Sequence, residues 1–185
     1  MNRSLACSRG RADQRGVTLL EVLVTILILA FGLIGLVGLQ TKVQTAQADA
    51  YQRAQAVLLV EDMANRISAN RVNAASYVTT TPLGTGDSQP ASCSGLTGAA
   101  LDACEWSKEL RGAAEQSAAG SVGAMIGARG CIAQVGTNPP VYQVTVAWQA
   151  MSSLGTPSLT CGSGSYVAET RRRAIGALVA VAKLS

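Results

Sequence analysis

Cysteines and carboxylates are the side chains of this sequence with the clearest capacity for chemistry. The chain of 185 residues has five cysteines and no histidine. It therefore lacks the imidazole base of the Ser-His-Asp and Cys-His nucleophile systems and the ligands of His-containing zinc sites. We expect no enzyme of the common kinds, no catalytic residue, no metal and no cofactor.

Four cysteines fall in the second half of the chain: Cys93, Cys104, Cys131 and Cys161. An even number of cysteines in an exported segment favours disulfides. A zinc site of four thiolates is the competing interpretation, although no Cys-x-x-Cys pair occurs. Three pairings are possible, and the spacings make Cys93–Cys104 and Cys131–Cys161 the easiest loops to close.

A basic segment and an apolar segment adjoin at the N-terminus. Residues 1–16 carry four arginines against one aspartate, and the rest of the chain is nearly neutral, which gives little support to nucleic-acid binding. Residues 17–39 are apolar, with one charge at Glu21. As a helix they would span roughly 34 Å, enough to cross a membrane. The arginines place the N-terminus in the cytoplasm and the residues after 40 outside it.

The next segment continues the helix with a different pattern. Residues 40–72 predict an amphipathic continuation, because 41–72 contain neither glycine nor proline and their apolar residues recur every three or four positions. One continuous helix from about 17 to about 71 is therefore expected. Its second half would bury these positions: Val43, Ala46, Ala50, Ala54, Val57, Leu58, Ala64 and Ile67.

The remainder predicts loops and a small sheet. Residues 73–130 indicate a loop region with a second helix at about 99–117, and residues 131–185 an antiparallel sheet. The strand candidates are 131–135, 141–150 and 172–184. Alternation places two sets of residues on the inner face: Tyr142, Val144, Val146 and Trp148, then Ile175, Ala177, Val179 and Val181. A sheet packed on the amphipathic helix gives an α+β fold.

The run Arg171–Arg173 opens the last of these strands. It could bind an acidic partner or DNA, but a solvated or carboxylate-paired strand end is the favoured interpretation.

The junction at residues 15–21, Arg-Gly-Val-Thr-Leu-Leu-Glu, is the most specific motif of the chain. A basic leader ends in Gly16, an apolar helix begins at Val17, and Glu21 is its fifth residue. This motif resembles the class III signal of type IV prepilins, which a membrane-embedded aspartic peptidase cuts after the glycine before it methylates the new N-terminus. The resemblance implies a leader at 1–16, cleavage between Gly16 and Val17 and N-methylation of Val17, and it removes Cys7 with the leader.

The same resemblance gives Glu21 a role in filament assembly. A carboxylate in a bilayer costs roughly 2.5–3.5 kcal/mol, so such residues usually have a partner. In type IV pilins that partner is the free amine of a neighbouring subunit's first residue, here Val17. A stray acid near the membrane surface is the alternative. The family usually has Phe where this chain has Val17.

The apolar segment is similar to that of PilV-type minor pilins of type IVa pili. No proline precedes Pro82, and glycines stand at Gly32, Gly35 and Gly38. These glycines would serve either helix flexibility or close helix packing. The resemblance implies the type IV pilin fold, a long N-terminal helix packed on a small antiparallel sheet with disulfides in the C-terminal region.

The function expected from this resemblance is that of a minor pilin that promotes pilus assembly, twitching motility and adhesion. The subunit would be a single-pass inner-membrane protein with a periplasmic C-terminal domain, later inserted into the extracellular pilus at its tip or in an initiation complex. The implied partners are the prepilin peptidase, the inner-membrane assembly platform, the major pilin, other minor pilins and a tip adhesin.

Two alternatives stay open. One is a minor pseudopilin of type II secretion, which has the same architecture. The other is a secreted enzyme or binding protein with a removable signal peptide, for which residues 46–48 and 48–50 offer small-x-small sites. The apolar region is much longer than the 7–15 residues of a usual signal peptide.

Overall fold

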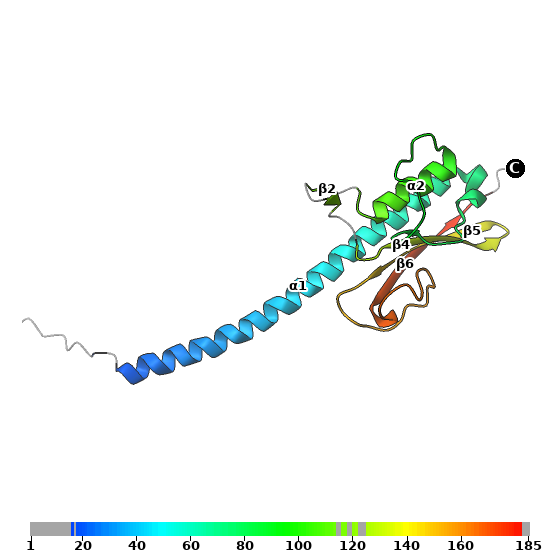
Figure 1. Ribbon diagram of the computed structural model, residues 1–185. Coiled ribbons are helices and arrows are strands. Elements are labelled where there is room, and N and C mark those ends of the chain that lie inside the picture. Colours follow the sequence, from blue (N-terminus) through cyan, green and yellow to red (C-terminus); the bar gives the residue numbers. More distant parts are fainter. Residues whose placement is uncertain (1–15, 17, 114–115, 118–119, 122–124, 183–185) are drawn as a thin grey trace, which may run out of the picture. The chain divides into compact units, whose positions relative to one another are not determined.

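The computed structural model describes residues 16, 18–113, 116–117, 120–121 and 125–182. These fall into two units, one within residues 1–43 and one within residues 44–185. Figure 1 labels the main helices and strands of the chain. Most of the expected leader (1–15), with Cys7, and also Val17 lie outside the described residues.

Helix α1 (Leu19–Ala69) contributes to both units. Its course agrees with the continuous helix expected from about 17 to 71. A 3₁₀ helix, η1 (Arg71–Tyr77), follows it, so the segment expected as loop from residue 73 starts with helical structure. Residues 18–43 of the first unit are exposed throughout.

The second unit is built on a four-stranded antiparallel sheet with the strand order β1-β4-β5-β6. Its strands are β1 (Leu83–Gly84), β4 (Arg129–Thr137), β5 (Pro140–Gln149) and β6 (Arg172–Ala180). A tight turn pairs Thr137 with Pro140, as the Gly-Thr-Asn-Pro-Pro signal predicts. Strand β4 is longer than the expected 131–135, because its pairing with β5 continues past an irregularity between Gln134 and Gly136.

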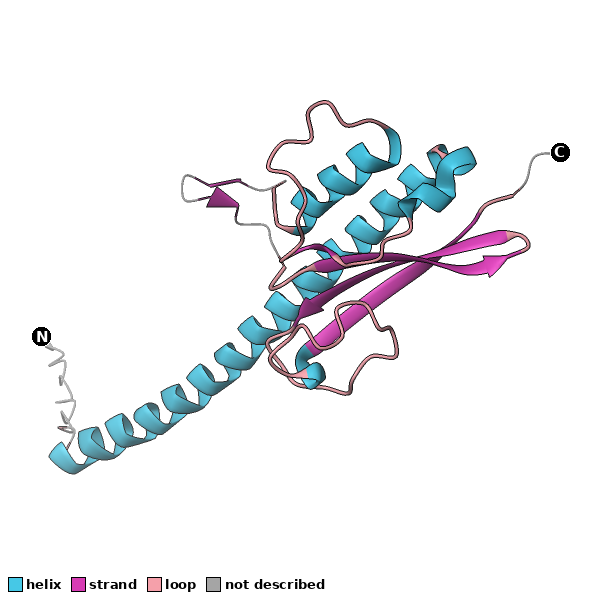
Figure 2. Ribbon diagram, turned by 45° about the vertical axis from the view of Figure 1, so that its right-hand side comes forward, coloured by secondary structure: helices cyan, strands magenta, loops and turns pink. Residues whose placement is uncertain are grey.

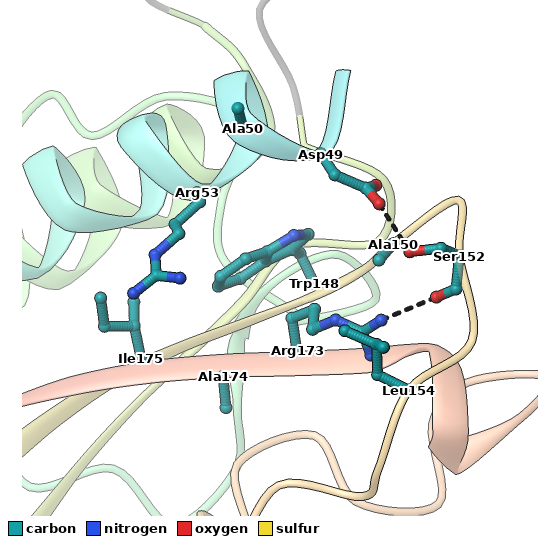
Figure 3. A pocket seen from close by; sticks show the side chains of 10 residues that line it. All are labelled: Asp49, Ala50, Arg53, Trp148, Ala150, Ser152, Leu154, Arg173, Ala174 and Ile175. Carbon is teal, nitrogen blue, oxygen red and sulfur yellow. Dashed lines mark hydrogen bonds between the residues drawn. The ribbon is translucent and has the colours of Figure 1, made fainter. Parts of the chain in front are cut away.

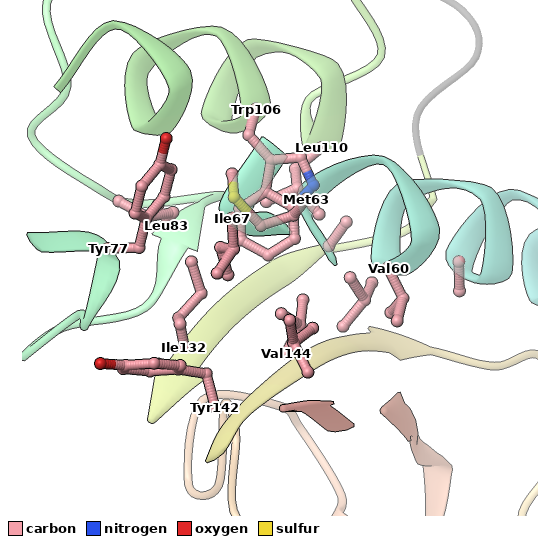
Figure 4. Packing of buried hydrophobic residues seen from close by; sticks show 14 of the residues in the cluster. Val60, Met63, Ile67, Tyr77, Leu83, Trp106, Leu110, Ile132, Tyr142 and Val144 are labelled. Carbon is pink, nitrogen blue, oxygen red and sulfur yellow. The ribbon is translucent and has the colours of Figure 1, made fainter. Parts of the chain in front are cut away.

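Helices cover one side of this sheet (Figure 2). The hydrophobic core lies between them and contains Val60, Met63 and Ile67 of α1, and Tyr142 and Val144 of β5 (Figure 4). The predicted inner faces of the last two strands are confirmed. All four residues of β5 are buried, and Ile175, Ala177, Val179 and Val181 belong to the core or pack on it.

The predicted buried face of the amphipathic helix is wrong at most positions, although Ile67 is buried as predicted and the half-buried Ala64 packs against the core. The buried residues of α1 are Gln52, Ala56, Val60, Met63 and Ile67, so only Ile67 is shared with the expected set. Leu58 is 59% exposed. Half of the expected positions are alanines, and an alanine gains less from leaving water than Val60 or Met63 of the buried face.

The predicted end of the second helix is also wrong. Helix α2 spans Gly98–Leu110, not 99–117, and residues 116–117 form a strand, β2 (Gln116–Ser117), which pairs with β3 (Gly120–Ser121). Gly112 has φ +82°; its N–H donates to the carbonyl of Glu109, and that of Ala113 donates to the carbonyl of Lys108. These two bonds form a Schellman motif, which ends the helix at a glycine in the left-handed conformation.

A long segment between β5 and β6 (residues 150–171) covers part of the other side of the sheet. Thr145 and Ala147 of β5, which point away from the helices, are buried there. A Cβ on Gly176 would lie 3.6 Å from Leu159, which shows how closely the segment approaches β6. The second unit therefore buries both faces of its central strand.

Candidate functional site: the N-terminal segment of the long helix

Thr18 forms the start of α1. Its carbonyl accepts from the N–H groups of Glu21 (3.0 Å) and Val22 (3.3 Å), and its Oγ1 also accepts from the N–H of Glu21 at 3.3 Å. This is the N-cap arrangement, in which a threonine hydroxyl satisfies one of the free donors at a helix start. Gly16 precedes this cap and is exposed, and no atom lies within 4 Å of a Cβ built on it.

Glu21 lies in the first turn of the helix. A carboxylate is favourable there because the free N–H groups give a helix start a partial positive charge. The side chain of Glu21 is exposed, and its carboxylate has no hydrogen bond or ion pair with any described residue. Within the first unit it remains available to an external cation.

The apolar residues around Glu21 are as open as the glutamate itself. Leu19 is 80% exposed and Leu20 is 74% exposed, and none of the side chains from residue 18 to residue 43 is buried. This part of α1 is long and apolar enough to cross a membrane. Such a surface needs an apolar environment from outside the chain.

The hydroxyl groups of Thr25 and Thr41 are satisfied within the helix. Thr25 Oγ1 donates to the carbonyl of Val22 at 2.8 Å, and Thr41 Oγ1 donates to the carbonyl of Val37 at 3.1 Å. Threonines bonded in this way can enter a bilayer without an unpaired donor.

The glycines of this segment leave space on the helix surface. Gly32, Gly35 and Gly38 lie within α1, and a Cβ at any of them would meet no atom within 4 Å. The helix continues through all three positions, and no contact within the chain requires a glycine at any of them.

The four cysteines of the second unit form two disulfides, Cys93–Cys104 and Cys131–Cys161. This is the pairing with the easiest loops to close. The first joins the segment before α2 to that helix, and the second joins the 150–171 segment to β4. In the part of the chain that the structure describes, no group of three or more His, Cys, Asp or Glu side chains is arranged to hold a metal ion.

A cluster around Arg66 joins α1 to α2 and was missed from the sequence. Arg66 donates to Asp62 of its own helix at 2.8 Å and to three carboxylates of α2, at distances of 2.7–3.2 Å: Asp102, Glu105 and Glu109. Burial lowers the pKa of Arg66, but its bonds to Glu105 and Asp62 outweigh that effect and raise it. The three-and-four spacing of the acids along α2 was the available signal.

One guanidinium does not stabilise the charged form of all four carboxylates around it. Burial and the neighbouring Asp62 raise the pKa of Glu109. Burial also raises the pKa of Tyr77, whose hydroxyl donates to Asp102. Arg66 therefore holds together groups that would otherwise repel one another.

Arg172 is the buried member of the run Arg171–Arg173. It donates to Glu169 Oε2 at 2.6 Å and to the carbonyl of Leu159 at 2.5 Å. The interpretation as a carboxylate-paired strand end is confirmed at this residue. Arg172 also donates to the backbone carbonyl of Cys161 at 3.3 Å, so it holds the 150–171 segment beside the disulfide.

Two protein-family models match the chain. The model of the prokaryotic N-terminal methylation motif matches residues 11–37, and the model of a Tt1218-like family, described as type IV pilin Tt1218, matches residues 38–104. No curated protein matches the chain, and no solved structure does. The first match covers the leader junction and the exposed apolar helix, and the second covers the rest of α1 and much of α2. With a long N-terminal helix, a small antiparallel sheet and two disulfides in the C-terminal region, this chain belongs to the type IV pilins.

Proposed function

We propose that this membrane-anchored pilin is a minor pilin of the PilV type, cleaved between Gly16 and Val17, methylated at Val17 and inserted into a type IV pilus. The supporting observation is the first unit itself. A fully exposed apolar helix carries one carboxylate, Glu21, in its first turn and without a partner among the described residues.

The cost of moving this helix determines how the subunit can work. Moving an exposed Leu, Ile or Val side chain from an apolar environment into water costs about 1.5–3 kcal/mol of free energy. For the segment as a whole the cost is on the order of 10 kcal/mol or more. The helix leaves the bilayer only for another apolar surface. In a filament, that surface is the bundle of equivalent helices of neighbouring subunits.

Glu21 makes the helix favour a bundle of pilin helices over other apolar surroundings. Its carboxylate gains a charged partner when the methylated amine of a neighbouring subunit lies beside it. The first docked subunits lack the full bundle, so a minor pilin that offers such a surface in the membrane promotes the first contacts. Its partners in this role are the major pilin, other minor pilins, the assembly platform and a tip adhesin, and its N-terminus is cytoplasmic.

The test is a count of surface pili in a deletion strain, with and without pilus retraction. We expect few pili and little twitching while retraction operates, unchanged major pilin in the membrane, and partial recovery of pili when retraction is blocked. Complementation with the intact chain is the control. A normal number of pili in the retracting deletion strain would contradict a role in initiation, and lost type II secretion with normal pili would identify a pseudopilin.

A further inference from the structure

A cavity of about 410 Å³ opens in the second unit beside Trp148 of β5. Its walls come from α1, from the end of β5 with the segment that follows, and from β6 (Figure 3). Trp148 and Arg173 are paired across β5 and β6, so their side chains share the face of the sheet toward α1. Nothing in the proposed assembly through the apolar helix uses this cavity.

Trp148, which lines the cavity, has an indole donor without a partner among the described residues. The residue is 4% exposed, and its Nε1 has no hydrogen-bond partner among the described residues. Buried indole N–H groups usually have one, as Trp106 shows by donating to the carbonyl of Leu59 at 2.9 Å. Asp49 lies on the nitrogen side of the Trp148 ring (Figure 3), but its carboxylate already accepts from the Met151 N–H and the Ser152 hydroxyl.

Two arginines give the cavity a net positive charge. Arg53 has no ion pair or hydrogen bond with any residue that the structure describes, and Arg173 donates only to backbone carbonyls. Asp49 is the one carboxylate of the lining, and it faces the nitrogen side of Trp148. An anion is therefore disfavoured beside Nε1 and favoured beside Arg53, on the other side of the ring.

The remaining wall is apolar. Leu154 and Ile175 line the cavity, and Leu154 is largely exposed. A ligand suited to the Trp148 donor, the apolar wall and Arg53 has a neutral carbonyl acceptor, an apolar side chain and a nearby carboxylate. A peptide with an apolar residue next to Glu or Asp carries these three groups on neighbouring residues.

We propose that this cavity binds an acidic segment of another polypeptide. A backbone carbonyl of the segment accepts from Trp148 Nε1, its apolar side chain lies against Leu154, and its carboxylate pairs with Arg53, near which Ile175 lies (Figure 3). The proposal does not depend on the pilus role of the chain.

The experiment uses the two indole N–H resonances of the full chain, labelled with ¹⁵N-tryptophan in detergent micelles, with Trp148→Phe for assignment. The probes are the dipeptides acetyl-Leu-Glu-amide and acetyl-Leu-Gln-amide, which differ by one charge. We expect the Glu peptide to shift the Trp148 resonance in a saturable way while Trp106 stays fixed. The Gln peptide should bind about tenfold more weakly, because it lacks the charge-assisted bond.

Two variants test the role of Arg53. Arg53→Gln should remove the preference for the Glu peptide, and Arg171→Gln, at an exposed arginine outside the cavity, should keep it. An unchanged Trp106 resonance shows in each case that the fold is intact. The proposal is overturned if neither peptide moves the Trp148 resonance at millimolar concentration, which would mean that water alone pairs with Nε1, or if both peptides bind equally to the wild type.

Discussion

The indole ring of Trp106 occupies the space that a side chain at residue 130 would need. A Cβ on Gly130 would lie 2.3 Å from the Cζ3 and Cη2 atoms of the ring and 2.8 Å from Leu110 Cδ1. Helix α2 therefore lies directly on the backbone of β4, and the contact requires glycine.

Gly130→Ala should lower the free energy of unfolding by about 2–3 kcal/mol, because the buried ring of Trp106 cannot move aside without displacing α2. Urea unfolding of the oxidised protein measures the change. Gly155→Ala is the matched control, since no atom lies within 4 Å of its Cβ position, and it should stay within about 0.5 kcal/mol of wild type. Equal effects of the two substitutions would show that the Trp106 ring can shift to admit a Cβ at residue 130 without loss of stability.

Arg66→Gln should destabilise the protein by about 2 kcal/mol at neutral pH, because it leaves four carboxylates without their shared cation. Its effect should shrink in acid, where the carboxyl of Glu109, whose pKa is raised by burial, takes up a proton. Lys108→Gln is the control, since it removes a positive charge from α2, the helix of three of the four acids, and Lys108 forms no ion pair with them. A loss that does not depend on pH would argue against an electrostatic role.

Glu109→Gln should cost little at neutral pH. Burial raises the pKa of this carboxyl above its ordinary value of 4.5, so the folded protein binds the proton more tightly than the unfolded chain does. Wild-type stability therefore gains from Glu109 as the pH falls through the raised pKa toward 4.5, and the gain is absent in the variant. Urea unfolding at several pH values compares the two. If the stability of the variant relative to the wild type fell as the pH rose, the pKa of Glu109 would be lowered in the folded protein and not raised.

Gly16→Phe should leave the leader attached, because a peptidase needs an extended, unhindered backbone at the bond that it cuts, and glycine supplies it. Intact mass of the membrane-extracted protein distinguishes the two forms: the processed chain lacks residues 1–16 and carries an added methyl group. Gly155→Phe, in open space, should be processed normally. An N-terminus at Asp49 or Tyr51 in the wild type would instead indicate an ordinary signal peptide.

Glu21→Gln should reduce incorporation into pili while cleavage continues, because the amide cannot form an ion pair with a neighbouring amine. Immunoblots of sheared pili and of membranes give the incorporated fraction. Glu61→Gln is the matched control, an exposed glutamate of the same helix in the second unit. Incorporation of Glu21→Gln at the wild-type level would remove the ion pair from the mechanism.

The predictions from sequence were accurate where one local pattern determines the structure. Alternation along β5 gives its buried face, and the absence of glycine and proline after residue 40 gives the length of α1. They failed where two patterns compete. The second half of α1 has two apolar stripes, and the sheet selects the one with Val60 and Met63. Gly112 ends α2 in the left-handed conformation, and a glycine at this position is the stop signal in the sequence.

Other features arise from residues far apart in the sequence. Arg66 meets acids about forty positions later, and the cavity joins Arg53 to Trp148 and Arg173. No periodicity encodes such contacts, because they depend on how the helices and the sheet pack. Arg172 illustrates the same point: three adjacent arginines look alike in sequence, and strand register decides which of them is buried.

The two disulfides have a consequence for how the chain is oxidised as it is made. Each one joins cysteines that are neighbours in the order of synthesis, Cys93 with Cys104 and then Cys131 with Cys161. Where the C-terminal domain emerges progressively from a translocation channel, the first pair is complete before the third thiol appears. An oxidant that joins cysteines strictly in order of arrival thus produces the native connectivity, and disulfide isomerisation is not required.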